Sequence, residues 1–312
     1  MAKEVLFLVA PTGSGKTQLS LDLARRLGLE IVSADSMLVY RGMDIGTAKP
    51  TRAERQRIRH HLIDLVSPPA NFSVHRHRRQ ALKAIQQIVA RGGTPLVVAG
   101  GGLYLDALWK GLSDPPGGSV RIRRGFEREA DEKGLASLHE KLRKLDPVRA
   151  RAIHPNDRRR IIRAFEIASL SGKRPSEWRA RRGGLEDLGY RVRVFGIRRE
   201  RTDLYDRINH RVESMFRKGF LAEVKRLGRR GFSKTAAQAL GYREILNALA
   251  QKNRPVSRAE LVRLIQKRTR QFAKRQLTWF RREKAVSWID CRKDESMRSV
   301  CDKILIRIHG KE

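Results

Sequence analysis

The hydrophobic positions in the first hundred residues form short continuous runs separated by segments with helical spacing. The runs cover residues 5–10, 30–34 and 95–99, and runs of this kind are typical of strands buried on both faces. Between them, leucines 19, 23 and 27 and the apolar residues from 81 to 89 recur at helical spacing. Strands alternating with helices predict a doubly wound α/β fold with a parallel sheet.

Residues 114–118, which read DPPGG, interrupt this alternation. Helical patterns without strands follow through about Gly184, and either Asn156 or Asp157 can cap a helix there. Alternating apolar residues from 192 to 197 then restore a strand, and the remainder reads as helical, including a long helix over 257–282. We therefore expect an α/β core begun by residues 1–116 and completed by 187–312, with a helical domain inserted at 117–186.

The net charge of the chain indicates which kind of molecule it binds. The 312 residues include 68 Lys and Arg against 33 Asp and Glu, which gives a formal net charge of +35. Solubility needs a net charge of only about 2–8, so nucleic acid is the default partner, since phosphate neutralisation releases counterions. An arginine-rich composition without any partner is the alternative.

The sequence also argues against a membrane-spanning protein, a protein with a targeting segment, and one held by disulfides or zinc. No run approaches the ~18 apolar residues of a membrane span, and Met1 leads almost directly into the first apolar run without a targeting segment. Cys291 and Cys301 match neither a disulfide framework nor a zinc site. We expect a soluble cytoplasmic protein that does not bind membranes.

Residues 10–17 read APTGSGKT and stand between the first predicted strand and helix. Backbone N–H groups of such a P-loop surround an anion at the helix N-terminus. Lys16 adds a positive charge, and the Thr17 hydroxyl is placed to ligate Mg²⁺. The segment therefore predicts a phosphate site of the nucleotide-binding type, although the loop reads phosphates rather than the base.

Two further features bear on the chemistry. The third strand ends in Ala99 and glycines, without the acid that holds the metal in ATP-hydrolysing P-loop proteins. Asp35 ends the second strand, and strand carboxyl ends line the ligand crevice of an open parallel sheet. Asp35 is therefore a candidate general base, although a turn or cap aspartate remains open. One hypothesis is therefore a small-molecule P-loop kinase, in which Asp35 is the base for the acceptor hydroxyl.

Five strings together resemble one family, the bacterial tRNA dimethylallyltransferases (tRNA isopentenyltransferases). They are PTGSGKT, ADSMLVYRGMDIGTAKP, HPNDRRRIIRAFE, QALGYREI and FAKRQLTWFR, which begin at residues 11, 34, 154, 238 and 272. The strings occur in the family's order, and the match covers nearly the whole chain. The resemblance implies a P-loop NTPase-like core with an inserted all-helical domain. It also implies transfer of a dimethylallyl group from dimethylallyl diphosphate to N6 of adenosine 37 in tRNA, by a monomer that uses Mg²⁺.

The resemblance also implies roles for individual residues. Asp35, Lys16 and Thr17 are the catalytic candidates, with Thr17 on Mg²⁺. The diphosphate site comprises Ala10, Pro11, Thr12, Gly13, Ser14, Gly15, Lys16 and Thr17. The residues expected at tRNA are Asp35, Ser36, Met37, Leu38, Gly101, Arg121, Arg159, Arg160, Arg163, Gln238, Gly241, Tyr242, Arg243, Lys274, Arg275, Gln276, Thr278, Trp279 and Arg281.

This chain departs from the family pattern in two places. Gly101 stands where the family has a threonine expected to meet the diphosphate and the target base, and Arg76 and His77 replace an acid and an aromatic residue. His75 and His77 suggest a metal site, but we expect both on an exposed helix face. Trp279 and Phe280 offer stacking surfaces or core packing. The departure at Gly101 leaves a non-catalytic RNA-binding protein as a further alternative.

Overall fold

The computed structural model describes residues 3–113, 115–179, 183–251 and 256–310. Its sheet has the strand order β3-β2-β4-β1-β5-β6, with every neighbouring pair parallel. The strands are β1 (Lys3–Val9), β2 (Glu30–Ala34), β3 (His60–His61), β4 (Pro95–Ala99), β5 (Tyr190–Arg199) and β6 (Val286–Cys291). The predicted α/β fold with a parallel sheet is therefore confirmed, and the first three predicted strands correspond to β1, β2 and β4.

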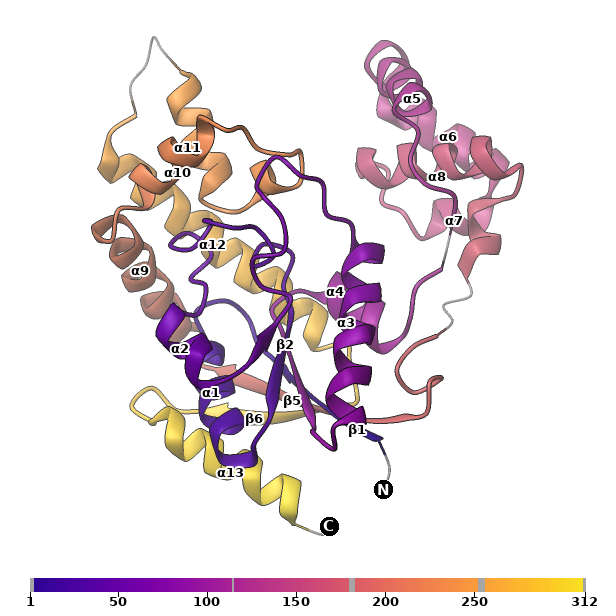
Figure 1. Ribbon diagram of the computed structural model, residues 1–312. Helices are drawn as coiled ribbons and strands as arrows, with labels where there is room; N and C mark the ends of the chain where they lie inside the picture. The colour runs from indigo at the N-terminus through magenta and orange to yellow at the C-terminus, as the bar shows by residue number, and fades with distance from the viewer. Residues whose placement is uncertain (1–2, 114, 180–182, 252–255, 311–312) are drawn as a thin grey trace. The chain divides into compact units, whose positions relative to one another are not determined.

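The chain divides into two compact units, of which the larger comprises Met1–Trp109 and Leu185–Glu312. Its helices are α1 (Lys16–Leu27), α2 (Arg52–Arg57), α3 (Val74–Ala90), α4 (Gly102–Trp109), α9 (Arg201–Arg217), α10 (Phe220–Gly228), α11 (Tyr242–Ala250), α12 (Arg258–Phe280) and α13 (Met297–His309). Alternate residues of β1 pack into different cores: Phe7 contacts the cluster under α3 and α4, whereas Leu8 contacts the cluster under α1 and α13 (Figure 1). This alternation is how a parallel sheet buries both faces.

A third cluster packs the loop after β2 against the helices between β5 and β6. Tyr40 and Met43 from the loop are fully buried together with Phe220 of α10 and Tyr242 of α11. The loop is therefore part of the folded core of this unit, and α9 to α12 (Figure 1) support it.

The second unit, Lys110–Gly184, contains helices but no strand among its described residues. It contains α5 (Val120–Lys133), α6 (Leu135–Leu145), α7 (Pro147–Arg151) and α8 (Arg158–Ser171), followed by a 3₁₀ turn at Pro175–Arg179. Asp157 accepts a hydrogen bond from the N–H of Arg160 and so caps α8, one of the two caps that the sequence allowed. Phe126 stacks on Phe165, with 4.8 Å between ring centroids, inside its own small core.

The sequence prediction missed two edge strands. We expected only helices after residue 197, but Val286–Cys291 forms β6 beside β5. Val286 packs into the cluster under α3 and α4, and Ile289 into the cluster under α1 and α13. Exposed polar residues, Ser287 and Asp290, separate these buried positions, so β6 lacks the continuous apolar run that marked the central strands. The two-residue β3 is too short to leave a pattern. Within the part of the chain that the structure describes, no helix is long and apolar enough to cross a bilayer.

Candidate active site

The P-loop turns from the end of β1 into the first residue of α1. Gly13 and Gly15 have φ angles of +84° and +92°, which glycine adopts at little cost because it lacks Cβ. Ser14 is almost fully buried, and its Oγ has no hydrogen-bond partner among the described residues. A buried hydroxyl of this kind normally finds a partner, and a phosphate oxygen cradled by the loop would supply an acceptor.

Three polar side chains from distant parts of the sequence converge beside Gly100, just after β4. A Cβ built on Gly100 would lie 2.8 Å from Nζ of Lys16, 3.5 Å from Nε2 of Gln276 and 3.7 Å from Oδ2 of Asp35. A side chain at Gly100 would therefore displace the Lys16 ammonium from its present position. The structure brings Asp35 to the P-loop lysine, as the carboxyl ends of neighbouring parallel strands require.

The Asp35 carboxylate is oriented by its own turn. Oδ1 accepts a hydrogen bond of 2.7 Å from the N–H of Met37. Oδ2 is the oxygen that would lie 3.7 Å from a Cβ on Gly100. One oxygen therefore fixes the side chain and the other faces the site.

Gln276 on α12 connects the P-loop to the loop after β4. Its Oε1 accepts a 3.0 Å hydrogen bond from the N–H of Thr12, and its Nε2 donates to the carbonyl oxygen of Gly100. Gln276 is buried, so in this structure its amide joins two loops of the site. Its expected contact with tRNA stays a prediction.

Arg211 on α9 is a charged member of the site that the sequence prediction missed. Its Nη2 donates to the carbonyl oxygen of Thr47 at 3.4 Å. Burial lowers the pKa of Arg211, and the charge of Asp35 opposes this shift. Leu204, Ile208 and Val212 mark the buried side of α9, and the periodicity that identifies that side places residue 211 beside it.

Burial and neighbouring charges have opposing effects on the pKa of Lys16. Burial is the largest cause that lowers its pKa, to about 8; Asp35 raises it, and Arg211 lowers it further. Its Nζ also donates to the carbonyl oxygen of Ala10 at 3.3 Å. A bound diphosphate adds negative charge here and therefore favours the protonated lysine.

Because the pKa of Lys16 is about 8, it is only half-protonated at pH 8 before ligand binds. We expect pyrophosphate binding at pH 8 to take up about half a proton more in the wild type than in Lys16→Arg, whose guanidinium is always charged. Affinity should fall as the pH rises through 8. Calorimetric titrations in two buffers of different ionisation enthalpy measure the proton uptake. Subtracting the uptake of Lys16→Arg from that of the wild type removes the contribution of the titration of pyrophosphate itself. Equal uptake by both proteins would contradict this prediction.

Comparison with known proteins agrees with this geometry. Residues 38–283 match the family model described as IPP transferase. The chain is 46% identical to the tRNA dimethylallyltransferase of Geobacter metallireducens over 92% of each chain, and 43% identical to that of Carboxydothermus hydrogenoformans over 98% and 97%. The chain belongs to the tRNA dimethylallyltransferase family.

Solved structures of the family have the same fold. The tRNA isopentenylpyrophosphate transferase of Bacillus halodurans superposes with a TM-score of 0.69 at 39% identity, covering 97% of this chain and 96% of that one. A eukaryotic dimethylallyltransferase acting on tRNA gives 0.79 at 27% identity, covering 100% of this chain and 81% of that one. The P-loop fold expected from the resemblance is thereby confirmed.

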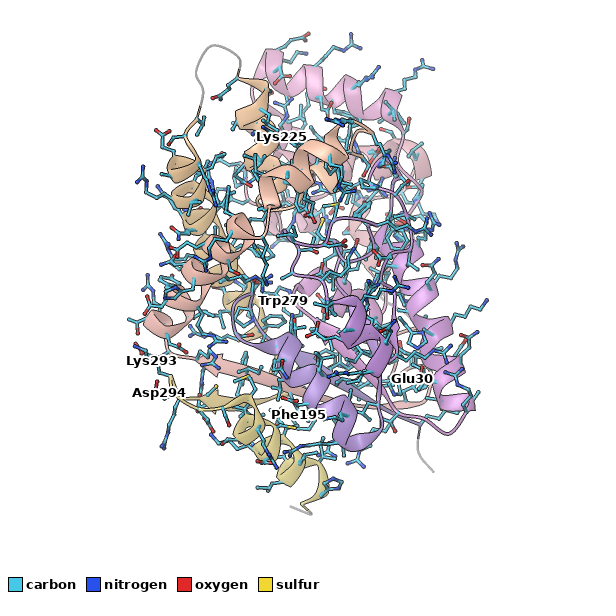
Figure 2. The ribbon with its side chains drawn as sticks, turned by 60° about the vertical axis from the view of Figure 1, so that its left-hand side comes forward. Glu30, Phe195, Lys225, Trp279, Lys293 and Asp294 are labelled. Atoms are coloured by element: carbon cyan, nitrogen blue, oxygen red, sulfur yellow. The ribbon has the colours of Figure 1, made fainter. Side chains whose placement is uncertain are left out.

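The residues that the family assigns to tRNA differ in how accessible they are. On α12, Lys274, Arg275 and Thr278 are exposed, as is Arg281 directly after the helix. Trp279, in the last turn of α12 (Figure 2), is half-buried, and a Cβ on Gly102 would lie 2.3 Å from its indole ring. This segment therefore presents cations to solvent and one aromatic ring against the glycine loop.

Phe280 and Tyr242 are part of the protein core. Phe280 is fully buried, so of the two alternatives, stacking surface or core packing, it is core packing that holds for this residue. Tyr242 is also fully buried, and its hydroxyl donates to Glu223. Glu223 in turn accepts hydrogen bonds from the N–H groups of Asp44, Ile45 and Gly46 at 2.8–3.1 Å. The tyrosine of the GYRE string thus supports the loop after β2.

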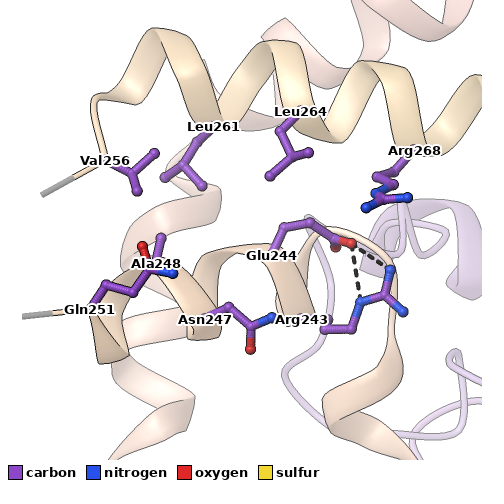
Figure 3. A pocket seen from close by; sticks show the side chains of 9 residues that line it. All are labelled: Arg243, Glu244, Asn247, Ala248, Gln251, Val256, Leu261, Leu264 and Arg268. Atoms are coloured by element: carbon purple, nitrogen blue, oxygen red, sulfur yellow. Dashed lines mark hydrogen bonds and ion pairs between the residues drawn. The ribbon is translucent and has the colours of Figure 1, made fainter. Parts of the chain in front are cut away.

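The residues next to Tyr242 in the string QALGYREI differ in their surroundings. Gln238 is exposed, whereas Gly241 is buried with a φ of +87°. The guanidinium of Arg243 forms two hydrogen bonds with Glu244 at the edge of a cavity of about 410 Å³ between α11 and α12 (Figure 3). This cavity is not lined by Lys16, Asp35 or Gly100, so it is not the P-loop site.

In the helical unit, Arg121, Arg159 and Arg160 are exposed on α5 and α8. Arg163 donates to the buried Glu166 at 2.6 Å and to the carbonyl oxygen of Pro116 at 2.7 Å. Arg163 therefore connects the start of the unit to α8. The other three are exposed, and Arg160 forms an ion pair of 3.4 Å with Asp157.

The two departures from the family pattern have different structural settings. His77 is fully buried, so our expectation of an exposed helix face for it was wrong, while His75 is exposed. The reason is periodicity, because residue 77 shares the inner side of α3 with Ala81 and Ile88. Burial lowers the pKa of His77 to about 4. The described residues contain no group of three His, Cys, Asp or Glu side chains that could hold a metal.

Gly101 lies in open space. A Cβ added there would have no heavy atom within 4 Å, and its φ is outside the left-handed region. The backbone at this position therefore accepts a threonine, in contrast to Gly100 and Gly102 on either side.

Proposed function

We propose that this tRNA dimethylallyltransferase holds the diphosphate of dimethylallyl diphosphate in its P-loop and uses Asp35 as the base for N6 of adenosine 37 in tRNA. The observation that supports this most directly is the convergence of Lys16 and Asp35 beside Gly100. A cation for the leaving group and a carboxylate for the attacking amine stand at one point. The specific family match favours this function over the kinase and the non-catalytic alternatives.

The reaction requires one displacement at C1 of the dimethylallyl group. The bond from C1 to the diphosphate oxygen breaks, the bond from N6 to C1 forms, and the N6 proton passes to the Asp35 carboxylate. Lys16, Arg211 and the N–H groups at the start of α1 stabilise the charge on the departing diphosphate. Because these groups are already in place before the reaction, their reorganisation costs little.

Mg²⁺ fits the donor set of this site. Mg²⁺ is usually held by one or two oxygen side chains together with substrate phosphates and water, and Thr17 is half-buried at the start of α1. Thr17 would hold the ion together with the diphosphate. When bound, the ion neutralises negative charge on the leaving group.

The substrate adenosine must leave the stack of the anticodon loop, since a stacked base does not present its amine to a carboxylate at the edge of the sheet. Exposed cations along α12 are suited to phosphate contacts, and Trp279 offers an aromatic face. We propose that the protein acts on tRNA as a monomer.

Mass spectrometry of nucleosides tests this function. We expect N6-(dimethylallyl)adenosine after incubation of unmodified tRNA with the protein, Mg²⁺ and dimethylallyl diphosphate. Omitting Mg²⁺ should lower the yield, and a tRNA carrying guanosine at position 37 should give no product. Absence of product from a folded protein that binds tRNA would overturn the proposed activity.

The cations of α12 give a prediction for binding. Replacing Lys274, Arg275 and Arg281 together by glutamine should weaken tRNA binding and flatten its log–log salt dependence, by roughly 0.7–0.9 for each lost phosphate contact. Filter binding over a salt series measures the slope. Three exposed cations on α2 and α3, Arg52, Arg57 and Lys83, provide a control of equal charge. An unchanged slope in the first variant would mean that its residues do not contact phosphates.

A further inference from the structure

Two arginines hydrogen-bond to carbonyl oxygens of the P-loop. Nε of Arg199, the last residue of β5, donates to the carbonyl oxygen of Ser14 at 2.8 Å. Nε of Arg207, on α9, donates to the carbonyl oxygen of Gly13 at 3.0 Å. Consecutive carbonyls of the phosphate loop are thus held by side chains that lie about 190 residues later in the chain.

These contacts determine where the loop N–H groups point. The peptide bonds of the described residues are trans, and in a trans peptide the N–H points opposite to the C=O of the same unit. Holding the oxygens of Gly13 and Ser14 toward the arginines therefore directs the N–H groups of Ser14 and Gly15 the other way. The N–H of Ser14 donates to the carbonyl oxygen of Pro11 at 3.4 Å and so closes a turn of the loop, and the N–H of Gly15 is the one directed into the cradle. A loop whose donors are already directed loses less entropy when an anion binds.

Arg199 is itself rigidly held. Its guanidinium is 1% exposed and pairs at 2.7 Å with Asp203, which is 5% exposed. It also donates to the carbonyl oxygen of Arg292 at 3.3 Å, just after β6. Because Asp203 neutralises its charge, Arg199 acts on the P-loop through a directed hydrogen bond rather than through net charge.

We propose that Arg199 and Arg207 are positioning residues of the diphosphate site. Arg199 orients the N–H of Gly15 toward the anion, and Arg207 holds the peptide between Gly13 and Ser14 in the turn that precedes it. This inference rests on the proposed role of the P-loop. Neither arginine has to touch the substrate for this role.

Calorimetric titration with inorganic pyrophosphate and Mg²⁺ tests the proposal. Arg207→Met removes one contact at an exposed residue, so folding should be retained. Arg199→Met combined with Asp203→Asn removes the other contact without leaving a buried charge. We expect each protein to bind pyrophosphate about tenfold more weakly than the wild type, the effect of losing one charged hydrogen bond. In NMR spectra of the free proteins, the amide signals of Ser14 and Gly15 should already be displaced.

Matched controls come from the same elements. Arg198 on β5 pairs with Asp290 at the surface, and Arg201 on α9 lies over the ring of Tyr205. Arg198→Met and Arg201→Met each remove one positive charge and should bind pyrophosphate within twofold of the wild type. Equal losses in the controls would overturn the proposal, because they would show that net charge alone decides affinity.

Three further outcomes separate the possible failures. A lower melting temperature with unchanged pyrophosphate affinity would mean that Arg199 is merely structural. Restoration of affinity by Arg207→Lys would mean that Arg207 acts as a charge on the anion. Failure of the wild type itself to bind pyrophosphate would instead overturn the proposed diphosphate site, whatever the variants do.

Discussion

Asp35→Asn should lower the rate of dimethylallyl transfer by about 10²–10⁴-fold, the typical contribution of a general base. The amide is nearly isosteric with the carboxylate, and its oxygen can still accept the hydrogen bond that Met37 donates to Oδ1. The side chain should therefore keep its place while it loses the ability to take the N6 proton. Single-turnover transfer with saturating tRNA measures the chemical step.

The affinity for tRNA should change little in this variant, because the shape of the side chain is preserved. Asp302 of α13 forms an ion pair at the surface with Arg26 of α1. Asp302→Asn makes the same chemical change at a residue outside the site and should leave the rate unaltered. A rate for Asp35→Asn within threefold of the wild type would remove Asp35 from the role of base.

Gly101→Thr should accelerate the same step by about tenfold or more. A donor that acts on the transition state contributes about 2.7–4 kcal/mol at comparable sites, which sets an upper limit of roughly 10²–10³-fold. Because a water molecule can bridge a missing hydrogen bond, we expect an effect below this limit. Because a Cβ at residue 101 meets no heavy atom within 4 Å, the new side chain should cost little stability.

Gly101→Val is the matched control for the hydroxyl, since valine has nearly the shape of threonine without its donor. The valine variant should be no faster than the wild type, and melting curves should show that both variants fold. A threonine variant that is equally stable and no faster would show that the hydroxyl is not what limits this active site.

The elements nearest the site could be predicted because their patterns are local. Each of the first three strands is a continuous apolar run, and glycine-rich turns follow two of them, so β1, β2 and β4 were predicted with errors of at most a few residues. Parallel pairing then placed Asp35 opposite Lys16. An edge strand whose buried residues are interrupted by exposed polar ones, such as β6, carries a much weaker pattern.

The contacts that complete the site could not be predicted in the same way. Gln276 joins Thr12 to Gly100, and Arg199 reaches Ser14, only because α12 and β5 come to lie beside the P-loop. No local spacing encodes such a contact, since it depends on which strand is the neighbour of β1. Arg211 is an intermediate case, because the periodicity of α9 marks its position but not what it faces.

The position of β5 affects how this protein can fold during synthesis. β1 is hydrogen-bonded to β5 along its whole length, yet β5 begins at Tyr190, so the ribosome makes the entire helical unit first. Until then, β1 has an unpaired apolar edge of the kind that promotes aggregation. Pairing across such a separation in sequence is slow, and a nascent chain that stalls before residue 190 leaves that edge open. Early folding of the compact helical unit shortens the effective loop that must close.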